Sequence, residues 1–137
     1  MTVLADFNTI IHEDPQSVSV QQGRPSPLGT RFSTGGRLGE GSGQTGALGA
    51  FIMFSVLNLQ VRLDVFVNGE GPIGTMDPNP QGAPGWNSQV LCMSGGRLKS
   101  GDGFNNEISV ALPPTSLVAP TTLRIKNLIC FYHQDSE

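Results

Sequence analysis

The stretch Leu57 to Asn68, LNLQVRLDVFVN, decides the fold of this chain because an apolar residue occupies every odd position. Successive side chains of a β-strand point to opposite faces, so this alternation predicts one strand with one buried face. Polar residues fill the even positions until Phe66 and are expected to face water or a polar partner. Asn68-Gly69 then predicts a tight turn, since both residues tolerate left-handed dihedral angles.

The preceding run, Leu48 to Val56, has its apolar residues at even positions, so the alternation shifts by one residue at Val56-Leu57. Such a shift predicts either a β-bulge or a bend that carries the chain from one sheet to another. Phe51 and Met53 add apolar side chains at odd positions. We therefore expect this half of the run to be covered on both faces.

Other alternating segments predict strands at Val3 to Ile11, Ser17 to Gln21, Ser88 to Ser94, Glu107 to Leu112 and Thr122 to His133. Gly- and Pro-rich connections separate them, including a long predicted loop that follows Asn68-Gly69 and runs to Asn87. Helix signals are few. The pattern predicts an all-β fold, a single-domain antiparallel β-sandwich of about seven or eight strands over residues 1–137.

Two of these strands carry an expectation about their faces. In the first, odd-numbered apolar residues, among them Phe7, share one side. In the last, the odd-numbered apolar residues Leu123, Ile125, Ile129 and Phe131 are expected to alternate on one face, with Asn127 interrupting them.

Length and composition restrict the class of protein. A chain of 137 residues can bury a core without a disulfide or a metal. Its net charge of −3 argues against a general nucleic-acid binder, and no apolar run reaches the roughly 20 residues of a membrane-spanning helix. The N-terminal residues lack the features of a signal peptide, which favours synthesis in the cytosol. Cys92 and Cys130 are expected to be free, buried thiols, with a disulfide as the alternative.

From Gln22 to Gly46 the chain is a Gly/Pro-rich arm with few bulky apolar residues. Loops of this length inside a domain are usually functional or disordered. Two interpretations stay open: a neighbouring subunit holds the arm, or the arm folds back on its own sheet. Arginine suits interfaces because its planar group makes several hydrogen bonds at once. The interface candidates are Arg24, Arg31, Phe32 and Arg37.

No catalytic signature is present. Adjacent residues on a strand or turn point apart, so His12, Glu13 and Asp14 do not converge unaided. Cys130 and His133 stand three residues apart on a predicted strand and face opposite sides. The chain also lacks Gly-x-Ser-x-Gly, phosphate-loop and Cys-x-x-Cys patterns. We expect a protein that is not an enzyme and that uses no cofactor.

Two groups of residues are candidate ligand sites. Asp102, Asn105 and Glu107 offer oxygen atoms of the kind that Ca²⁺ prefers, although they lack EF-hand spacing and also suit an ordinary turn. A sugar platform is the second candidate, because an indole face packs on sugar C–H groups while amides and carboxylates bond hydroxyls. Its residues are Asp77, Asn79, Trp86 and Asn87, with the alternative that Trp86 only anchors its loop.

The succession VFVNG, Trp86, LKSGDGFNNEISVAL and LRIKNLICFY resembles the jelly-roll β-sandwiches of galactose-binding and carbohydrate-binding-module domains. The resemblance extends from Val65 to Tyr132. It implies a jelly-roll arrangement of the sheets and, in carbohydrate modules, a structural calcium. Since such folds host unrelated activities, the resemblance bears more on fold than on function.

These observations predict a non-enzymatic structural or assembly protein that acts through protein–protein contacts. A virion component such as a phage capsid decoration protein suits the low charge, the Gly/Pro-rich loops and the missing catalytic set. We expect a homo-oligomer or a subunit of a larger assembly, with no nucleic-acid or membrane partner. The alternative is a carbohydrate-binding module or lectin that uses the loops around Trp86 and Asp102.

Overall fold

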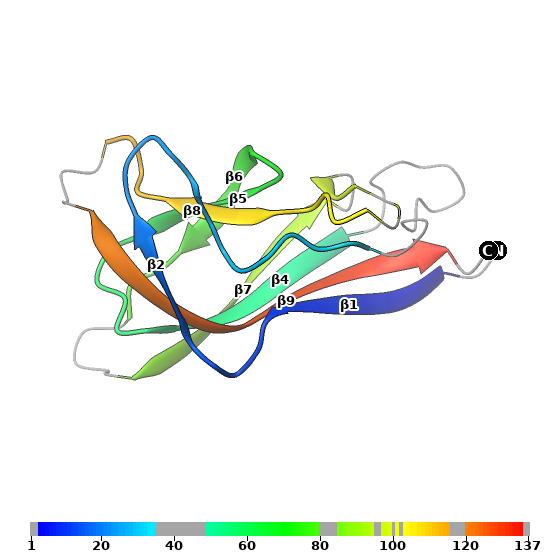
Figure 1. The fold of residues 1–137 in the computed structure, drawn as a ribbon, viewed down its shortest axis with the longest axis horizontal. Coiled ribbons are helices and arrows are strands. Elements are labelled where there is room, and N and C mark those ends of the chain that lie inside the picture. The colour runs from blue at the N-terminus through cyan, green and yellow to red at the C-terminus, as the bar shows by residue number, and fades with distance from the viewer. Residues whose placement is uncertain are drawn as a thin grey trace.

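The structure, a computed structural model, describes residues 3–34, 49–79, 85–94, 97–99, 101, 103–115 and 120–135. The described residues form nine strands: β1 (Val3–Ile11), β2 (Gln16–Val20), β3 (Ser26–Pro27), β4 (Gly49–Leu57), β5 (Leu63–Val67), β6 (Glu70–Met76), β7 (Trp86–Ser94), β8 (Ile108–Ala111) and β9 (Thr121–Asp135). They form two antiparallel sheets, one above the other in Figure 1. The predicted all-β sandwich is confirmed, with nine strands in place of seven or eight.

The lower sheet in Figure 1 has the order β1-β9-β4-β7, and β2 joins it by pairing with the first half of β9. The upper sheet has the order β3-β8-β5-β6. Strand pairs are nested along the chain: β5 pairs with β6, β4 with β7, β3 with β8, and both β1 and β2 with β9. Each pair lies in the sheet opposite to that of the next pair, so the chain repeatedly crosses the sandwich.

The hydrophobic core fills the space between the sheets. Even-numbered residues of β4 and odd-numbered residues of β5 face each other there and are almost fully buried, as the two alternating runs predict. Burying each such side chain stabilises the fold by about 1.5–3 kcal/mol. The largest fully buried side chains include Ile11, Leu28, Ile52, Phe54, Leu63, Met76, Ile108, Leu123, Ile125 and Leu128.

The prediction of one continuous strand from Leu57 to Asn68 is wrong. β4 ends at Leu57 and β5 begins at Leu63, and the five residues between them carry the chain from one sheet to the other. Asn58 has the left-handed φ of 47° that lets the chain turn there. Of the two explanations for the shifted alternation, the bend between sheets is the one observed. Leu59 stays buried because the bend still directs it inward.

The Asn68-Gly69 turn is confirmed, with φ of 55° and 76° at the two residues. The segment after it is partly a strand, however, because β6 pairs with β5 from Glu70 to Met76. This strand has no regular apolar alternation, since its outer positions include Gly and Pro. The prediction of one loop from Asn68-Gly69 to Asn87 is therefore wrong for Glu70–Met76, which form β6.

The odd-numbered apolar residues of β1 up to Phe7 share one side, as expected, and that side faces solvent. Phe7 is 58% exposed, while Ile10 and Ile11 are both buried. The pairing of β1 with β9 shifts between Thr9 and Ile11, a β-bulge that lets two consecutive residues reach the core.

In β9 the inward face changes at Asn127. Its φ is 53° and its N–H donates to the carbonyl oxygen of His12 at 2.8 Å. Before it the odd-numbered Leu123 and Ile125 are buried, and after it the even-numbered Leu128 and Cys130 are buried. The expectation that Ile129 and Phe131 share a face with the earlier pair is therefore wrong: both side chains lie on the outer side of the sheet.

The described part of the arm, residues 22–34, folds back on its own sheet. Leu28 and Phe32 are buried, and their backbone N–H groups donate to the carbonyl oxygens of Ile108 at 2.8 Å and Asn106 at 2.9 Å. This burial removes the Phe32 side chain from the surface that a partner could contact. The rest of the arm, with Arg37, lies outside the described residues.

Both cysteines are free, as predicted. Cys130 is buried in the core, and this burial raises the pKa of its thiol to about 12. Cys92 is exposed on β7, contrary to the expectation of two buried thiols. Among the described residues, no helix has the length and apolar character needed to cross a membrane.

Candidate interaction surface

The outer side of the five-stranded sheet carries a continuous set of apolar side chains, which we call the outer apolar face. Two rows of cross-strand neighbours build it, one through Phe7, Phe131, Phe51 and Cys92, the other through Ile129, Met53 and Val90. Residues paired in register lie on the same face of a sheet, so these side chains come together from β1, β9, β4 and β7.

Three phenylalanine rings form the centre of this face. The Phe51 and Phe131 rings are stacked, with centroids 4.6 Å apart and planes at 17°. Phe7 lies on the other side of Phe131 at a centroid distance of 5.9 Å. Aromatic pairs in this range stabilise each other by about 0.5–1.5 kcal/mol beyond their area burial. The three rings therefore form one contiguous aromatic group on the surface.

The face is open to solvent. Phe7 is 58%, Val90 53% and Phe51 38% exposed, although all three are large hydrophobic residues. Single exposed apolar residues are common on protein surfaces, but neighbouring ones on several strands are a mark of an interaction site.

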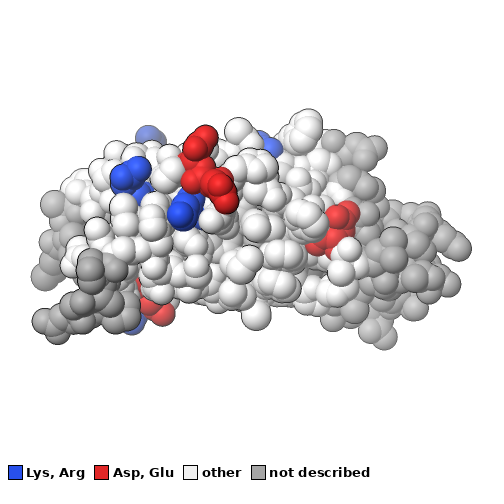
Figure 2. All heavy atoms as spheres, turned by 90° about the horizontal axis from the view of Figure 1, so that it is seen from below, with Lys and Arg blue, Asp and Glu red and all other residues white. Residues whose placement is uncertain are grey.

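Charged groups are sparse on this side of the molecule. Figure 2 shows the surface from below in Figure 1, the side on which the five-stranded sheet lies. Most of its described surface is uncharged, and the charged side chains include one mixed cluster of acidic and basic groups and a separate acidic side chain. Depletion of charge around aromatic and Met side chains is typical of the buried centre of protein–protein interfaces.

Trp86 lies on the same face at the far end of β7, opposite Leu57. Its side chain is 37% exposed, and the Lys126 ammonium lies 4.4 Å from the centre of its ring. Ser55 and Ser88 separate Trp86 from the phenylalanines and share a 2.8 Å hydrogen bond. Trp86 is thus a surface residue whose ring contacts a cation, and its exposure does not fit a plug buried in the core.

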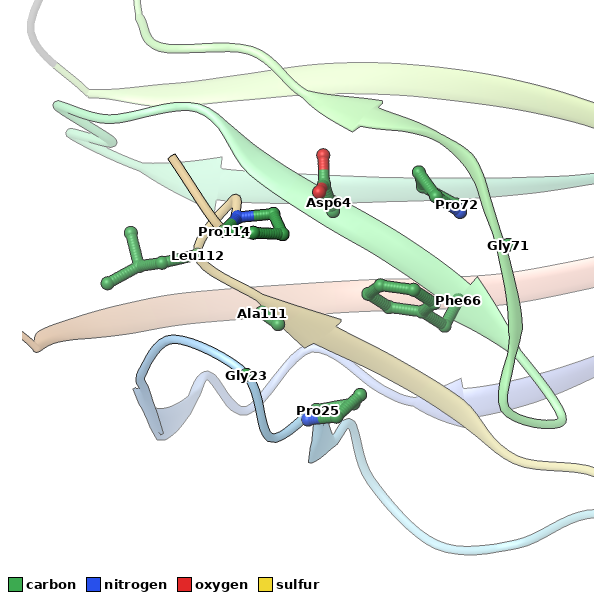
Figure 3. A pocket seen from close by; sticks show the side chains of 9 residues that line it. All are labelled: Gly23, Pro25, Asp64, Phe66, Gly71, Pro72, Ala111, Leu112 and Pro114. Carbon is green, nitrogen blue, oxygen red and sulfur yellow. The ribbon is translucent and has the colours of Figure 1, made fainter. Parts of the chain in front are cut away.

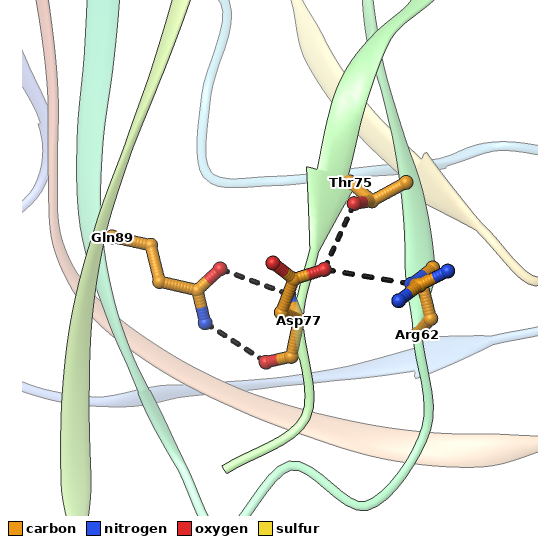
Figure 4. A network of polar contacts seen from close by, with 4 residues as sticks. All are labelled: Arg62, Thr75, Asp77 and Gln89. Carbon is orange, nitrogen blue, oxygen red and sulfur yellow. Dashed lines mark hydrogen bonds and ion pairs between the residues drawn. The ribbon is translucent and has the colours of Figure 1, made fainter. Parts of the chain in front are cut away.

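The other residues of the predicted sugar platform do not converge on Trp86. The Asp77 carboxylate accepts from Thr75 at 3.0 Å and pairs with Arg62 at 3.5 Å, and its backbone bonds Gln89 (Figure 4).

Asn79 uses its amide to join loops: Oδ1 accepts from the N–H of Leu59 at 3.2 Å, and Nδ2 donates to the carbonyl oxygen of Gly85 at 2.8 Å. Asn87 follows Trp86 on β7 and therefore points to the opposite face of the sheet.

At the predicted calcium site, Glu107 forms an ion pair with Arg31 at 3.4 Å. Asn105 Oδ1 lies 3.4 Å from Nδ2 of the buried Asn106, and Asp102 lies outside the described residues. A cation would have to compete with the Arg31 guanidinium for Glu107. In the described part of the chain, no group of three or more His, Cys, Asp or Glu residues could hold a metal ion.

The remaining arm residues lie at the surface. Arg31 is exposed and paired with Glu107, and Arg24 is exposed between Gly23 and Pro25. Both are on the connections that cover the four-stranded sheet, away from the outer apolar face.

Comparison with protein-family models, with curated proteins and with solved structures gives no match. The outer apolar face is the feature that inspection of the sequence missed. The apolar odd positions Phe51 and Met53 did signal a second covered face. The sequence did not indicate that Phe7 and Phe131 join it, because the backbone irregularities of β1 and β9 leave no clear mark in the sequence.

Proposed function

We propose that this chain is a non-enzymatic assembly protein whose copies associate through the outer apolar face. The observation that carries the proposal is the row of contacting rings of Phe7, Phe131 and Phe51 on an exposed sheet surface of low charge. Covering these rings in an interface would remove apolar area from water at about 25 cal/mol per Å².

The order of this surface supports the proposal further. Association costs less when the contacting side chains already hold their bound arrangement. The three rings contact one another and stand on three neighbouring hydrogen-bonded strands, which limits the side-chain freedom that association would remove. Phe and Met are also among the residues enriched in the centres of interfaces.

The strand order supports a jelly-roll form of the sandwich. If β1 and β2 are counted as one strand, since both pair with β9, eight strands remain and they pair first with last and so on inward. That nesting is the double Greek key of jelly rolls, whose known hosts include viral capsid and lectin domains. We propose a virion component, such as a capsid decoration protein, as the assembly role; this finer step rests on fold-level analogy.

The alternative, carbohydrate binding, draws less support. Asp77 and Asn79 are engaged in contacts within the chain, and Asn87 points away from Trp86. The polar groups that would recognise sugar hydroxyls are therefore not arranged around the indole. The contiguous apolar side chains favour a protein surface as the partner.

Sedimentation velocity over a concentration series tests the proposal. We expect the wild-type protein to associate, and the double variant Phe7→Ser/Phe51→Ser to weaken association by more than tenfold, which corresponds to about 1.4 kcal/mol. Phe104→Ser is the matched control, because Phe104 is 73% exposed but lies in the loop before β8. A wild-type protein that stays monomeric, or an oligomer that the double variant leaves intact, contradicts the proposal.

A further inference from the structure

A hollow of about 390 Å³ lies on the outer side of the four-stranded sheet, across the sandwich from the outer apolar face (Figure 3). Segments distant in the sequence meet around it: the connection from β2 to β3, the middle of β5, the start of β6 and the end of β8. Its walls are formed by Gly23, Pro25, Asp64, Phe66, Gly71, Pro72, Ala111, Leu112 and Pro114.

Asp64 is the one charged side chain among these wall residues. It projects outward from β5 because the odd-numbered neighbours Leu63 and Val65 point into the core. Figure 3 shows it between Pro72 and Pro114. The hollow thus has one carboxylate within walls that are otherwise apolar or glycine.

This carboxylate differs from the other acidic groups of the same sheet. Each of the others that the structure describes lies within ion-pair distance of an arginine: Glu107 with Arg31 at 3.4 Å, Asp77 with Arg62 at 3.5 Å and Glu70 with Arg97 at 3.9 Å. Within the described residues, Asp64 has neither an ion pair nor a side-chain hydrogen bond. A cation from outside the described chain would therefore meet no competing ion pair at this carboxylate.

Phe66 supplies the second element of recognition. It stands two residues after Asp64 on β5 and so projects from the same side of the sheet. Its ring lies close over Gly71, where a Cβ atom would come within 3.3 Å of it. An aromatic face attracts a cation that comes within about 6 Å of its centre. A carboxylate and a ring side by side suit a cation that also carries an apolar group.

We propose that this hollow binds a small organic cation, an ammonium or guanidinium group attached to an apolar body. The charge pairs with Asp64, and the apolar body rests on Phe66 and the proline rings. The volume lies within the range of about 300–1,000 Å³ that small-molecule sites occupy. The site is separate from the outer apolar face, so it neither requires nor excludes the proposed assembly role.

Titration of ¹⁵N-labelled protein with benzylammonium chloride at constant ionic strength tests the proposal. We expect the amide signals of Asp64, Phe66 and Leu112 to shift together and to give one dissociation constant. Asp64→Asn keeps the side-chain shape but removes the charge, and we expect it to weaken binding by about threefold or more. Benzyl alcohol, which lacks the charge, is expected to bind the two proteins equally.

Two further variants separate this site from general charge effects. Asp6→Asn removes an exposed carboxylate on the other sheet and should leave the affinity unchanged. Arg24→Gln removes an exposed cation between two wall residues, so affinity should stay the same or rise. Equal affinity of wild-type and Asp64→Asn for benzylammonium, shifts that centre elsewhere, or weaker binding by Arg24→Gln would each overturn the proposal.

Discussion

Asn106 Oδ1 accepts a hydrogen bond from Asn68 Nδ2 at 2.9 Å, which joins the loop before β8 to the turn between β5 and β6. Asn106 is fully buried, and the same oxygen accepts from the N–H of Lys99 at 2.7 Å, while Nδ2 donates to the Lys99 carbonyl oxygen at 2.8 Å. Asn68 in turn exchanges hydrogen bonds with the backbone of Glu107. Two asparagines thus hold three loops at one end of the four-stranded sheet.

Replacing Asn106 with Ala should destabilise the fold by about 2–4 kcal/mol, because the variant leaves several buried polar groups without partners. Equilibrium unfolding in urea measures the change. Asn105→Ala is the control, since the one side-chain hydrogen bond of Asn105 to another described residue is 3.4 Å long and the residue is only partly buried. Similar losses in the two variants would mean that Asn106 does not connect these loops.

Gln89 connects the two sheets at the β6–β7 edge (Figure 4). Its Oε1 accepts from the Asp77 N–H at 2.9 Å, and its Nε2 donates to the Asp77 carbonyl oxygen at 2.9 Å. We expect Gln89→Ala to cost about 1–2 kcal/mol in thermal or urea unfolding.

Asp77→Ala is the matched variant, because it retains these backbone groups and removes only the side-chain contacts to Thr75 and Arg62. The two ion-pair side chains are 62% and 65% exposed, so the expected loss is below about 1 kcal/mol. If Asp77→Ala proved more harmful than Gln89→Ala, the carboxylate would matter more than the inter-sheet bonds.

The left-handed backbone of Asn127 should make this position tolerant of glycine. We expect Asn127→Gly to change the free energy of unfolding by less than about 1 kcal/mol. Asn127→Val is expected to lose about 2 kcal/mol or more, because a β-branched residue resists positive φ. Equal stability of the two variants in urea unfolding would show that the backbone there does not require this conformation.

The buried Cys130 thiol predicts a loss of stability in alkali. The unfolded thiol ionises near its ordinary pKa of 9.0, whereas the folded thiol holds its proton until about pH 12. Between these values the unfolded state binds fewer protons, so stability falls with rising pH by up to about 1.4 kcal/mol per pH unit.

Unfolding of wild-type and Cys130→Ala measured between pH 8 and 11 isolates this contribution from other titrating groups. The wild-type curve should be steeper. Cys92→Ala, which removes the exposed thiol, should keep the wild-type slope. Parallel curves for wild-type and Cys130→Ala would contradict the assignment.

The sequence is sufficient to predict the two sheets and most of the core, because long alternating runs such as those around Phe54 and Val65 determine which side chains are buried. It is not sufficient to locate irregular backbone. The bend at Asn58 and the face change at Asn127 depend on the positive φ of a single residue, and asparagine also occurs in ordinary strands and turns.

The surface features depend on tertiary pairing even more strongly. The row of Phe7, Phe131 and Phe51 joins residues from the beginning, end and middle of the chain, and only the strand order brings them together. The lack of an ion pair at Asp64 among the described residues likewise depends on which carboxylates the fold places beside an arginine. No local pattern in the sequence reports either relationship.

The face change at Asn127 has a consequence for how this protein can evolve. Because a single residue sets which side of β9 points outward after it, deletion of that residue would exchange Phe131 with its buried neighbours Cys130 and Tyr132. Insertions and deletions near Asn127 should therefore be excluded by selection. Point substitutions at Phe131 remain open to variation, because they alter the outer apolar face and leave the buried neighbours in place.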